Sequence, residues 1–333
     1  MTKAFVTGGT GFLGGQLIKM LVQKGWQVRA LHRSPGDGAG LKALGAEPVQ
    51  GALDNLAKLQ QGISDAEVVF HAAALFKLWG TVEAFEHANV EGTRNVLAAA
   101  KTQGVKRFVQ IGAGAVVMGH GKPMLCVTED APQIFPKWAP YTASKGRAQQ
   151  LVLAADDPGG MRTAIILPPM IWGAGMPMIH ETIKNVQAGR FRWPGGGKSL
   201  MSTAHVDNIC HAAVLAAERA TGGRAYFVTD GQDRPMREMM GTLLATQGID
   251  PGDRSAPLGM AWLMATVMET LWRTFRIAGE PPLTRQMLRL VGYDFTMSDR
   301  RAREELGYAP IVTWEEGIEQ MRTRWRTTVK THG

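Results

Sequence analysis

A glycine-rich turn close to the N-terminus constrains the fold of this chain more than any other feature. The apolar run at residues 4–7 leads directly into Gly-Gly-Thr-Gly-Phe-Leu-Gly at residues 8–14. Glycines at positions 8, 11 and 14 allow a sharp turn, a close approach of backbone N–H groups to phosphate oxygens, and tight packing of a helix on a strand. The N-terminus of that helix adds free donors and the positive end of a dipole. The pattern therefore predicts a strand, a turn and a helix that hold the pyrophosphate of a dinucleotide.

A second motif lies far downstream, where Tyr141 and Lys145 stand four positions apart. Residues with this spacing are neighbours on one face of a helix, so the phenol and the ammonium group should lie together. A free phenol titrates near pH ~10, and a neighbouring positive charge lowers that value, which makes the pair a candidate for proton transfer. In this order along one chain, the two motifs indicate a dinucleotide-dependent enzyme.

With these two motifs the chain resembles the extended short-chain dehydrogenase/reductase family, and the resemblance covers nearly the whole chain. Further segments are similar to landmarks of that family, namely residues 71–74, 89–97, 169–173 and 205–208. Leu167 departs from the family pattern, which usually has Arg there. Within the family, the chain is most similar to the branch that holds the 3β-hydroxysteroid dehydrogenases and the NAD-dependent epimerases and dehydratases. The segments that carry this similarity to the 3β-hydroxysteroid dehydrogenases are residues 189–191, 205–213, 224–231 and 298–310.

Short apolar runs alternate with helical patterns in the first half of the chain, which predicts an α/β fold with a doubly wound parallel sheet (Rossmann) and a smaller, interleaved C-terminal substrate-binding region. Residues 1–169 are expected to form the NADP-binding Rossmann domain, with residues 204–231 returning to it. Residues 170–203 and 232–333 are expected to form the substrate-binding region. Strands are predicted at 3–7, 27–31, 47–50, 67–71, 106–111 and 162–167, and helices at 12–24, 54–60, 83–103 and 141–155.

The end of the second strand should decide between NAD and NADP. An acidic residue there would accept hydrogen bonds from ribose hydroxyls and repel a 2′-phosphate, but this chain has His32-Arg33-Ser34 and no acid before Asp37. In the reductases that this stretch resembles, the Arg that matches Arg33 holds the 2′-phosphate, for which its planar guanidinium is suited. NADP is therefore expected, with NAD as the alternative. The resemblance implies cofactor contacts from Gly8, Thr10, Gly11, Phe12, Leu13, Gly14, Arg33, Leu53, Ala72, Ala73, Lys145 and Pro168.

The resemblance also implies catalytic roles. Tyr141 would be the general acid/base, while Lys145 would lower its pKa and hydrogen-bond the nicotinamide ribose; the positive ring of the oxidised cofactor would act in the same direction. Asn89 matches an Asn that supports the active-site backbone. The family further places a Ser or Thr against the substrate oxygen, whereas this chain has Gly112-Ala113-Gly114.

The missing hydroxyl leaves three explanations open. Losing a hydrogen-bond donor aimed at a developing oxyanion typically raises the activation free energy by roughly 3–4 kcal/mol. Backbone N–H groups of residues 112–114, or a water in the vacated space, could take its place. Alternatively, the substrate could supply its own polar group, such as a vicinal carbonyl or hydroxyl, or the protein could bind NADP(H) with little turnover. Retention of Tyr141 and Lys145 favours the first two explanations.

Residues 258–278 carry the main signal about the substrate. Apolar side chains follow helical spacing there, and Met and Trp are concentrated in the segment. Such a stripe is typical of a core or interface helix. It fits equally a lid over an apolar substrate, or a helix that lies in a membrane surface with Trp and Arg at its edge. We expect a largely apolar substrate, sterol-like or long-chain, with peripheral membrane contact through residues 258–278 as an open alternative.

Three functions remain open. The first is an NADP(H)-dependent oxidoreductase that transfers hydride between nicotinamide and a secondary alcohol or ketone. The second is a nucleotide-sugar epimerase or dehydratase in which Arg190 and Arg192 clamp a diphosphate, although the Met-rich segments offer few polar residues for sugar hydroxyls. The third is an NADP(H)-binding regulatory protein with weak or no turnover.

Composition limits which partners and which cellular compartment we expect for this protein. Of the 333 residues, 45% are hydrophobic and 20% are charged, as in ordinary globular proteins. The net charge is +8, but the excess lies near the C-terminus without a nucleic-acid module, so no nucleic-acid partner is expected. Cys126 and Cys210 have no metal-like spacing, and neither a leader nor an apolar run of ~20 residues is evident, which predicts a cytoplasmic protein without a metal. By resemblance, helices 83–103 and 141–155 would pair with their copies in a homodimer.

Overall fold

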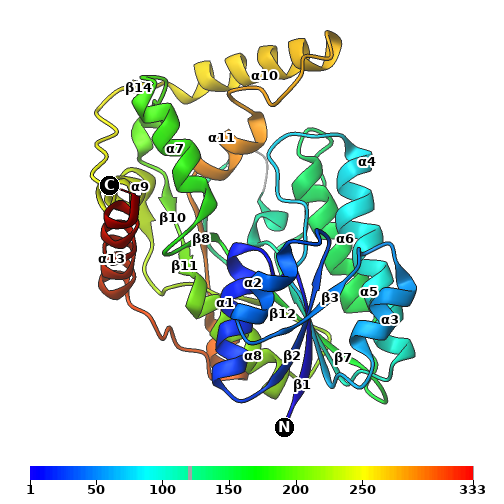
Figure 1. Cartoon of the computed structure of the whole chain (residues 1–333). Coiled ribbons are helices and arrows are strands. Elements are labelled where there is room, and N and C mark those ends of the chain that lie inside the picture. Colours follow the sequence, from blue (N-terminus) through cyan, green and yellow to red (C-terminus); the bar gives the residue numbers. More distant parts are fainter. Residues whose placement is uncertain (119–121, 333) are drawn as a thin grey trace.

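Seven parallel strands form one central sheet in the computed structural model, which describes residues 1–118 and 122–332 (Figure 1). The strand order is β3-β2-β1-β4-β5-β7-β12, so the direction of winding reverses between β1 and β4. Doubly wound folds bind ligands at that reversal, and the glycine turn follows β1 there. The predicted fold class is confirmed. The strands are β1 (Lys3–Thr7), β2 (Gln27–His32), β3 (Glu47–Gln50), β4 (Val68–His71), β5 (Arg107–Ile111), β7 (Arg162–Leu167) and β12 (Arg224–Phe227).

Helices cover both faces of this sheet (Figure 1). Helices α1 and α8 bury an apolar core on one face, and α3, α5 and α6 bury a second core on the other. Successive residues of a strand point to opposite faces, so Phe5 and Val6 of β1 contribute to different cores. The helices named so far, together with α2 beside β3, are α1 (Phe12–Gln23), α2 (Asp37–Ala43), α3 (Leu56–Ile63), α5 (Gly92–Thr102), α6 (Pro140–Ala154) and α8 (Val206–Arg219).

The single helix predicted at 83–103 is interrupted by one π-helical stretch. Helix α4 (Val82–Phe85) continues into a π segment, Glu86–Glu91, before α5 begins. The wider π turn accommodates an extra residue, and such turns frequently occur at functional sites. The apolar pattern of the sequence does not reveal it, because one inserted residue only shifts the 3.6-residue period. Asn89 lies in this segment.

A smaller sheet joins the second half of the chain to part of the first. Its strand order is β13-β10-β15-β6, and β6 precedes the boundary that was predicted at residue 169. Strand β8 pairs with β11 in a separate two-stranded sheet, and β9 pairs with β14 in another. The division into two regions stays a prediction, since strand pairing links them. The strands are β6 (Met124–Val127), β8 (Met170–Trp172), β9 (Trp193–Pro194), β10 (Leu200–Met201), β11 (Thr203–His205), β13 (Arg234–Pro235), β14 (Ser255–Ala256) and β15 (Phe295–Met297).

Methionine and tryptophan form the core of this second region. Trp172 and Trp193 are fully buried among the methionines of α9 and the side chains of α7 and α13. Methionine suits this place because its unbranched side chain fills irregular gaps. The remaining helices of the region are α7 (Pro177–Gln187), α9 (Met236–Ala245), α10 (Leu258–Thr274), α11 (Arg285–Val291), α12 (Arg300–Leu306) and α13 (Trp314–His332).

Helix α10 lies along the outer margin of the molecule, far from the main sheet (Figure 1). Its buried residues, Ala261, Ala265 and Glu269, occupy one side of the helix, which packs on α11. Within residues 1–118 and 122–332 no helix is both long and apolar enough to span a bilayer.

Candidate active site

The glycine turn has the geometry that a bound dinucleotide requires. Gly8 has a φ of 77°, and a Cβ there would lie 2.7 Å from the backbone nitrogen of Ala73. A Cβ on Gly14 would overlap the carbonyl of Gly8, so α1 packs on the turn only because position 14 is glycine. Helix α1 begins after Gly11 and no side chain caps it, which leaves the donors of its first turn for an anionic ligand. These residues fit a dinucleotide pyrophosphate.

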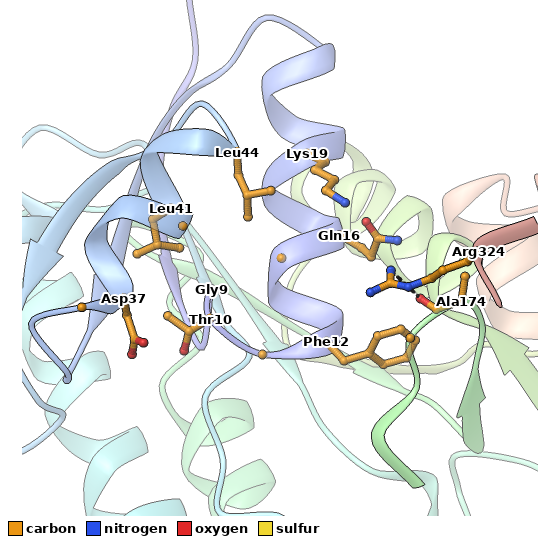
Figure 2. Close-up of a pocket in the computed structure, with 15 residues that line it drawn as sticks. Gly9, Thr10, Phe12, Gln16, Lys19, Asp37, Leu41, Leu44, Ala174 and Arg324 are labelled. Carbon is orange, nitrogen blue, oxygen red and sulfur yellow. Dashed lines mark hydrogen bonds between the residues drawn. The ribbon is translucent and has the colours of Figure 1, made fainter. Parts of the chain in front are cut away.

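A cavity of about 460 Å³ opens beside this turn (Figure 2). Gly9, Thr10 and Phe12 line it from the turn and α1, and Asp37 lines it from the start of α2. Figure 2 shows the side chains of Asp37 and Thr10 toward the same side of the cavity. An acidic side chain thus lines the cavity, although it lies four residues after Arg33 in the sequence.

The predicted adenosine contacts are more dispersed. Arg33 is exposed after β2 and does not line the cavity, while the ring of the preceding His32 hydrogen-bonds the carbonyl of Ser34 at 2.9 Å. Leu53 packs against Gly92 at the start of α5, where a Cβ would lie 2.8 Å from its Cδ1. The structure therefore gathers the glycine turn, Ala72 and Ala73 at one place, while Arg33 is exposed and outside the lining of the cavity.

Tyr141 and Lys145 are both buried on α6, one turn apart. The ring of Tyr141 contacts the edge of Phe76, with centroids 5.2 Å apart, and that of Phe85 at 6.2 Å. The ammonium group of Lys145 donates a hydrogen bond of 2.7 Å to the carbonyl of Ile111 at the end of β5. The pair therefore lies at the carboxyl end of the sheet, where ligands bind in this fold.

Burial dominates the titration of both groups. It lowers the pKa of Lys145 to about 8 and raises the pKa of Tyr141 above its ordinary value. The lowering of the Tyr141 pKa that Lys145 was expected to cause is not seen, because removal from water disfavours the phenolate. The raised pKa keeps Tyr141 protonated at neutral pH and makes it a weaker acid than a free phenol.

A buried chain of hydrogen bonds supports the site from beneath. The backbone N–H of Ala73 donates to the hydroxyl of Thr7 (3.3 Å), which bonds Nδ1 of His71 (2.7 Å). Nε2 of His71 bonds the hydroxyl of Thr93 (2.9 Å), and that hydroxyl donates to the carbonyl of Asn89 (2.6 Å). Because the single proton of Thr93 is used by Asn89, Nε2 of His71 must be the protonated nitrogen and the ring is neutral. Burial lowers the pKa of His71 to about 3, with the charge of Lys145 acting in the same direction.

The chain of hydrogen bonds continues toward Tyr141. The amide of Asn89 donates to the hydroxyl of Ser144 (3.0 Å), which in turn donates to the carbonyl of Tyr141 (2.8 Å). The same Asn89 side chain accepts from the backbone N–H of Leu75 at 2.7 Å. The π segment therefore links the end of β4 to α6. Thr7, Thr93 and Ser144 were not identified from the sequence, since isolated hydroxyl residues carry no pattern there.

A methionine packs against Gly114, one of the two glycines where the family resemblance would place a hydroxyl. A Cβ on Gly114 would lie 2.8 Å from Sδ of Met297 and closer still to its Cε. The N–H groups of Gly112 and Gly114 donate to the carbonyls of Ile166 (2.7 Å) and Pro168 (2.9 Å). These two donors and the space beside Gly114 are therefore already used. The N–H of Ala113, a water elsewhere, a polar group of the substrate, and weak turnover stay open as explanations.

The arginines considered for a diphosphate clamp are occupied by their own loop. Arg190 bonds the side chain of Asn185 at 3.1 Å, and Arg192 bonds the carbonyls of Gly189 (2.9 Å) and Phe191 (2.6 Å). They help to shape the segment after α7 in this structure.

Comparison with known proteins agrees with this geometry. A sequence model of the 3-beta hydroxysteroid dehydrogenase/isomerase family matches residues 5–258. The 4-hydroxy-2-methyl-3-oxo-4-farnesyl-3,4-dihydroquinoline-1-oxide ketoreductase of Stigmatella aurantiaca is 41% identical over 321 residues, which cover 96% of this chain and 96% of the relative. A 2-alkyl-3-oxoalkanoate reductase of Stenotrophomonas maltophilia is 34% identical over 327 residues, covering 96% of this chain and 98% of the relative.

Solved structures share the fold. The crystal structure of dTDP-glucose 4,6-dehydratase from Streptomyces venezuelae, which holds NAD, has a TM-score of 0.76 and covers 99% of this chain and 98% of its own, at 21% identity. That likeness concerns the arrangement of helices and strands alone. The family match, the sequence relatives, the glycine turn and the Tyr141–Lys145 pair agree: the chain belongs to the 3-beta hydroxysteroid dehydrogenase/isomerase family, a branch of the extended short-chain dehydrogenase/reductases.

Proposed function

We propose that the protein is an NADP(H)-dependent reductase that converts a ketone on a largely apolar substrate into a secondary alcohol. The observation that carries the proposal is the buried Tyr141–Lys145 pair at the carboxyl end of the sheet, beside the glycine turn. A bound nicotinamide cofactor supplies the hydride. The hydroxyl of Tyr141 donates its proton to the carbonyl oxygen, and the ammonium group of Lys145 stabilises the phenolate that remains.

The reductive direction is supported by the relatives. Two relatives with high coverage are named as a ketoreductase and a reductase.

The substrate should carry a polar group next to the ketone. We take Gly114 as the position of the family's hydroxyl; Met297 packs against it, which leaves no side-chain donor there. The name of one relative describes a 4-hydroxy group beside a 3-oxo group, and the other acts on a 3-oxoalkanoate. A neighbouring hydroxyl could donate a hydrogen bond to the carbonyl oxygen as negative charge develops on it, which is the task of the absent residue. The carboxylate of a 3-oxo acid is ionised at neutral pH and cannot donate, so that substrate would need another donor.

Cofactor choice rests on two residues of opposite charge. Arg33, which is exposed after β2, would bind a 2′-phosphate. Asp37, which lines the cavity together with Thr10, would accept hydrogen bonds from a ribose hydroxyl. We propose NADP, with NAD as the alternative. Titration with NADPH and NADH, followed by tryptophan fluorescence, should show NADPH preference that falls in Arg33→Ala and rises in Asp37→Asn. Preference for NADH, lost in Asp37→Asn, would reverse the assignment.

The catalytic proposal is tested with Tyr141→Phe, using Tyr293→Phe as the matched control. Turnover of 3-oxo acids and α-hydroxy ketones with NADPH should be lost in the first variant and kept in the second, with cofactor binding intact in both. Unchanged turnover in Tyr141→Phe would refute the role of the phenol. Turnover of UDP- or dTDP-sugars would favour the epimerase/dehydratase alternative, and cofactor binding without turnover of any panel would favour a regulatory protein.

A homodimer through the π segment, α5 and α6, and a cytoplasmic location, stay predictions. Both follow from the family resemblance and from cysteine usage rather than from a contact in this structure. Sedimentation velocity of the purified protein measures the first directly.

A further inference from the structure

An apolar stripe runs along the outward side of α10. Six side chains on it are between 41% and 69% exposed, namely Met260, Leu263, Met264, Val267, Leu271 and Phe275. Apart from the adjacent pair Leu263 and Met264, they follow one another at intervals of three or four residues, so they share one face of the helix. Isolated exposed apolar residues are common, but a continuous stripe of this length marks an interaction surface.

The opposite side of α10 is already occupied. Ala261, Ala265 and Glu269 are buried against α11, and the ring of Trp262 packs edge-on against Trp138 with centroids 5.6 Å apart. The core-helix interpretation of residues 258–278 is therefore wrong for the stripe. A lid whose apolar side faces the substrate is equally inconsistent with it, because that side faces away from the protein.

The charges around the stripe are positive. Glu269 is the only acidic residue of α10, and it is buried and paired with Arg285 at 2.7 Å. Arg273 and Arg276 are exposed at the C-terminal end, where Arg273 lies 5.1 Å from the ring centre of Trp79. The next acid along the chain, Glu280, is paired with Lys77 at 3.5 Å. The surface thus combines an apolar stripe with unneutralised cations and tryptophan.

This end of α10 lies next to the entrance of the active site. Trp79, which contacts Arg273, shares a short loop with Phe76, and Phe76 contacts the ring of Tyr141. Phe76 is itself 55% exposed. An apolar partner that covers α10 would therefore lie beside the loop of Phe76 and Trp79, which borders Tyr141.

We propose that α10 docks in the plane of an anionic lipid bilayer, with the stripe at the boundary of headgroups and acyl chains and Arg273 and Arg276 at the phosphates. Amphipathic helices with cations and tryptophan at the edge of an apolar face bind membranes in this way. A second copy of the chain fits less well. A two-fold interface brings the same patch together twice, and this patch contains cations but no exposed carboxylate to pair with them.

The docking does not depend on the catalytic assignment, and binding is its readout. Flotation of the full chain with phosphatidylglycerol/phosphatidylcholine vesicles at low salt should recover it with the lipid, and added salt should weaken the binding. Leu263→Ser/Val267→Ser should lower partitioning by roughly a hundredfold or more, since each buried side chain contributes about a tenfold effect. Arg273→Gln/Arg276→Gln should lower it by roughly twenty- to thirtyfold on anionic vesicles, about fivefold for each charge.

The matched control is Leu56→Ser/Ile311→Ser, which removes two similarly exposed aliphatic side chains far from α10. It should bind vesicles like the wild type. A wild type that stays unbound at low salt, or a control that loses binding as much as the α10 variant, would overturn the proposal. So would a wild type that ignores vesicles but forms an oligomer that Leu263→Ser/Val267→Ser dissociates in sedimentation velocity, since the stripe would then join two copies of the chain.

Discussion

Restoring the missing hydroxyl tests whether Met297 replaces it. In Gly114→Ser the new Cβ would lie 2.8 Å from Sδ of Met297 and 3.1 Å from the carbonyl of Pro168. The backbone at Gly114 is not in the left-handed region, so any loss of stability comes from packing. Met297 is only 6% exposed, and its backbone N–H is held by the hydroxyl of Ser202 at 2.9 Å, so the thioether has to move into filled space. Overpacking of this kind costs about 1–3 kcal/mol of unfolding free energy.

A double-mutant cycle separates this effect from a general one. Met297→Ala alone should cost about 2–5 kcal/mol, because it leaves a cavity. In that background the serine enters vacated space, so Gly114→Ser should be nearly neutral, and the coupling free energy should be about 1–3 kcal/mol. The control is Gly112→Ser, whose Cβ would meet Leu167 and Gln149 at 2.7 and 2.8 Å, away from Met297. Its loss of stability should not depend on residue 297.

Urea unfolding of the four proteins of the cycle gives the free energies, and NADPH oxidation gives the activity. Additive losses for Gly114→Ser and Met297→Ala, within about 0.5 kcal/mol, would refute the packing argument. In the double variant, kcat should rise by tenfold or more for a simple ketone, and less for a ketone with a neighbouring hydroxyl, since a donor of this kind contributes roughly a hundredfold or more. An equal gain on both substrates would refute the view that the substrate supplies the polar group.

Three further outcomes follow from buried polar groups. Burial lowers the pKa of Lys145 from 10.5 to about 8, so between these pH values the unfolded chain binds more protons than the folded one. The free energy of unfolding should therefore rise with pH in that window. Urea unfolding from pH 8 to 9.5, below the titration of Tyr141, should show a smaller rise for Lys145→Met than for the wild type. The pKa of His71 is lowered from 6.5 to about 3, so stability should fall as pH drops through that window, and His71→Gln should remove part of the fall in an acid titration followed by circular dichroism. Asp230 accepts hydrogen bonds from Trp172 (2.6 Å), the backbone of His205 (2.7 Å) and Asn208 (2.8 Å). Asp230→Ala should therefore lower the free energy of unfolding by about 3 kcal/mol. A loss below about 1 kcal/mol would contradict its role in joining β11 and α8.

The main sheet could be predicted because its signals are local. Strand β7 has the bounds expected from the sequence, and β5 differs by one residue, since each is a short apolar run that ends in turn residues. Helix α2 was not expected, because its sequence, Asp-Gly-Ala-Gly-Leu-Lys-Ala, is rich in glycine and has low helix propensity. Its formation places Asp37 in the cofactor cavity, so the miss affected the interpretation of the site.

The pairing of Tyr141 with Lys145 could be predicted because their spacing matches the helical repeat. The contact of Met297 with Gly114 could not, because the two residues are far apart in sequence and a methionine belongs to no motif. The raised pKa of Tyr141 was missed for a similar reason: the neighbour in sequence, Lys145, predicted a lowering, whereas burial by Phe76, Phe85 and the rest of the fold acts more strongly.

The family match ends at residue 258, where α10 begins, and Met297 on β15 lies beyond it. The glycine turn and the Tyr141–Lys145 pair, which we propose for hydride transfer, lie within residues 5–258. Met297, which we propose to border the substrate oxygen, and α10, which we propose to bind membranes, lie at the end of that match or beyond it. On these proposals, substrate choice and substrate supply depend on a different part of the chain from the chemistry. Exchanging residues 258–298 with those of a relative should change which ketone is reduced and whether vesicles are bound, while leaving cofactor preference unchanged, because Arg33 and Asp37 lie outside the exchanged segment.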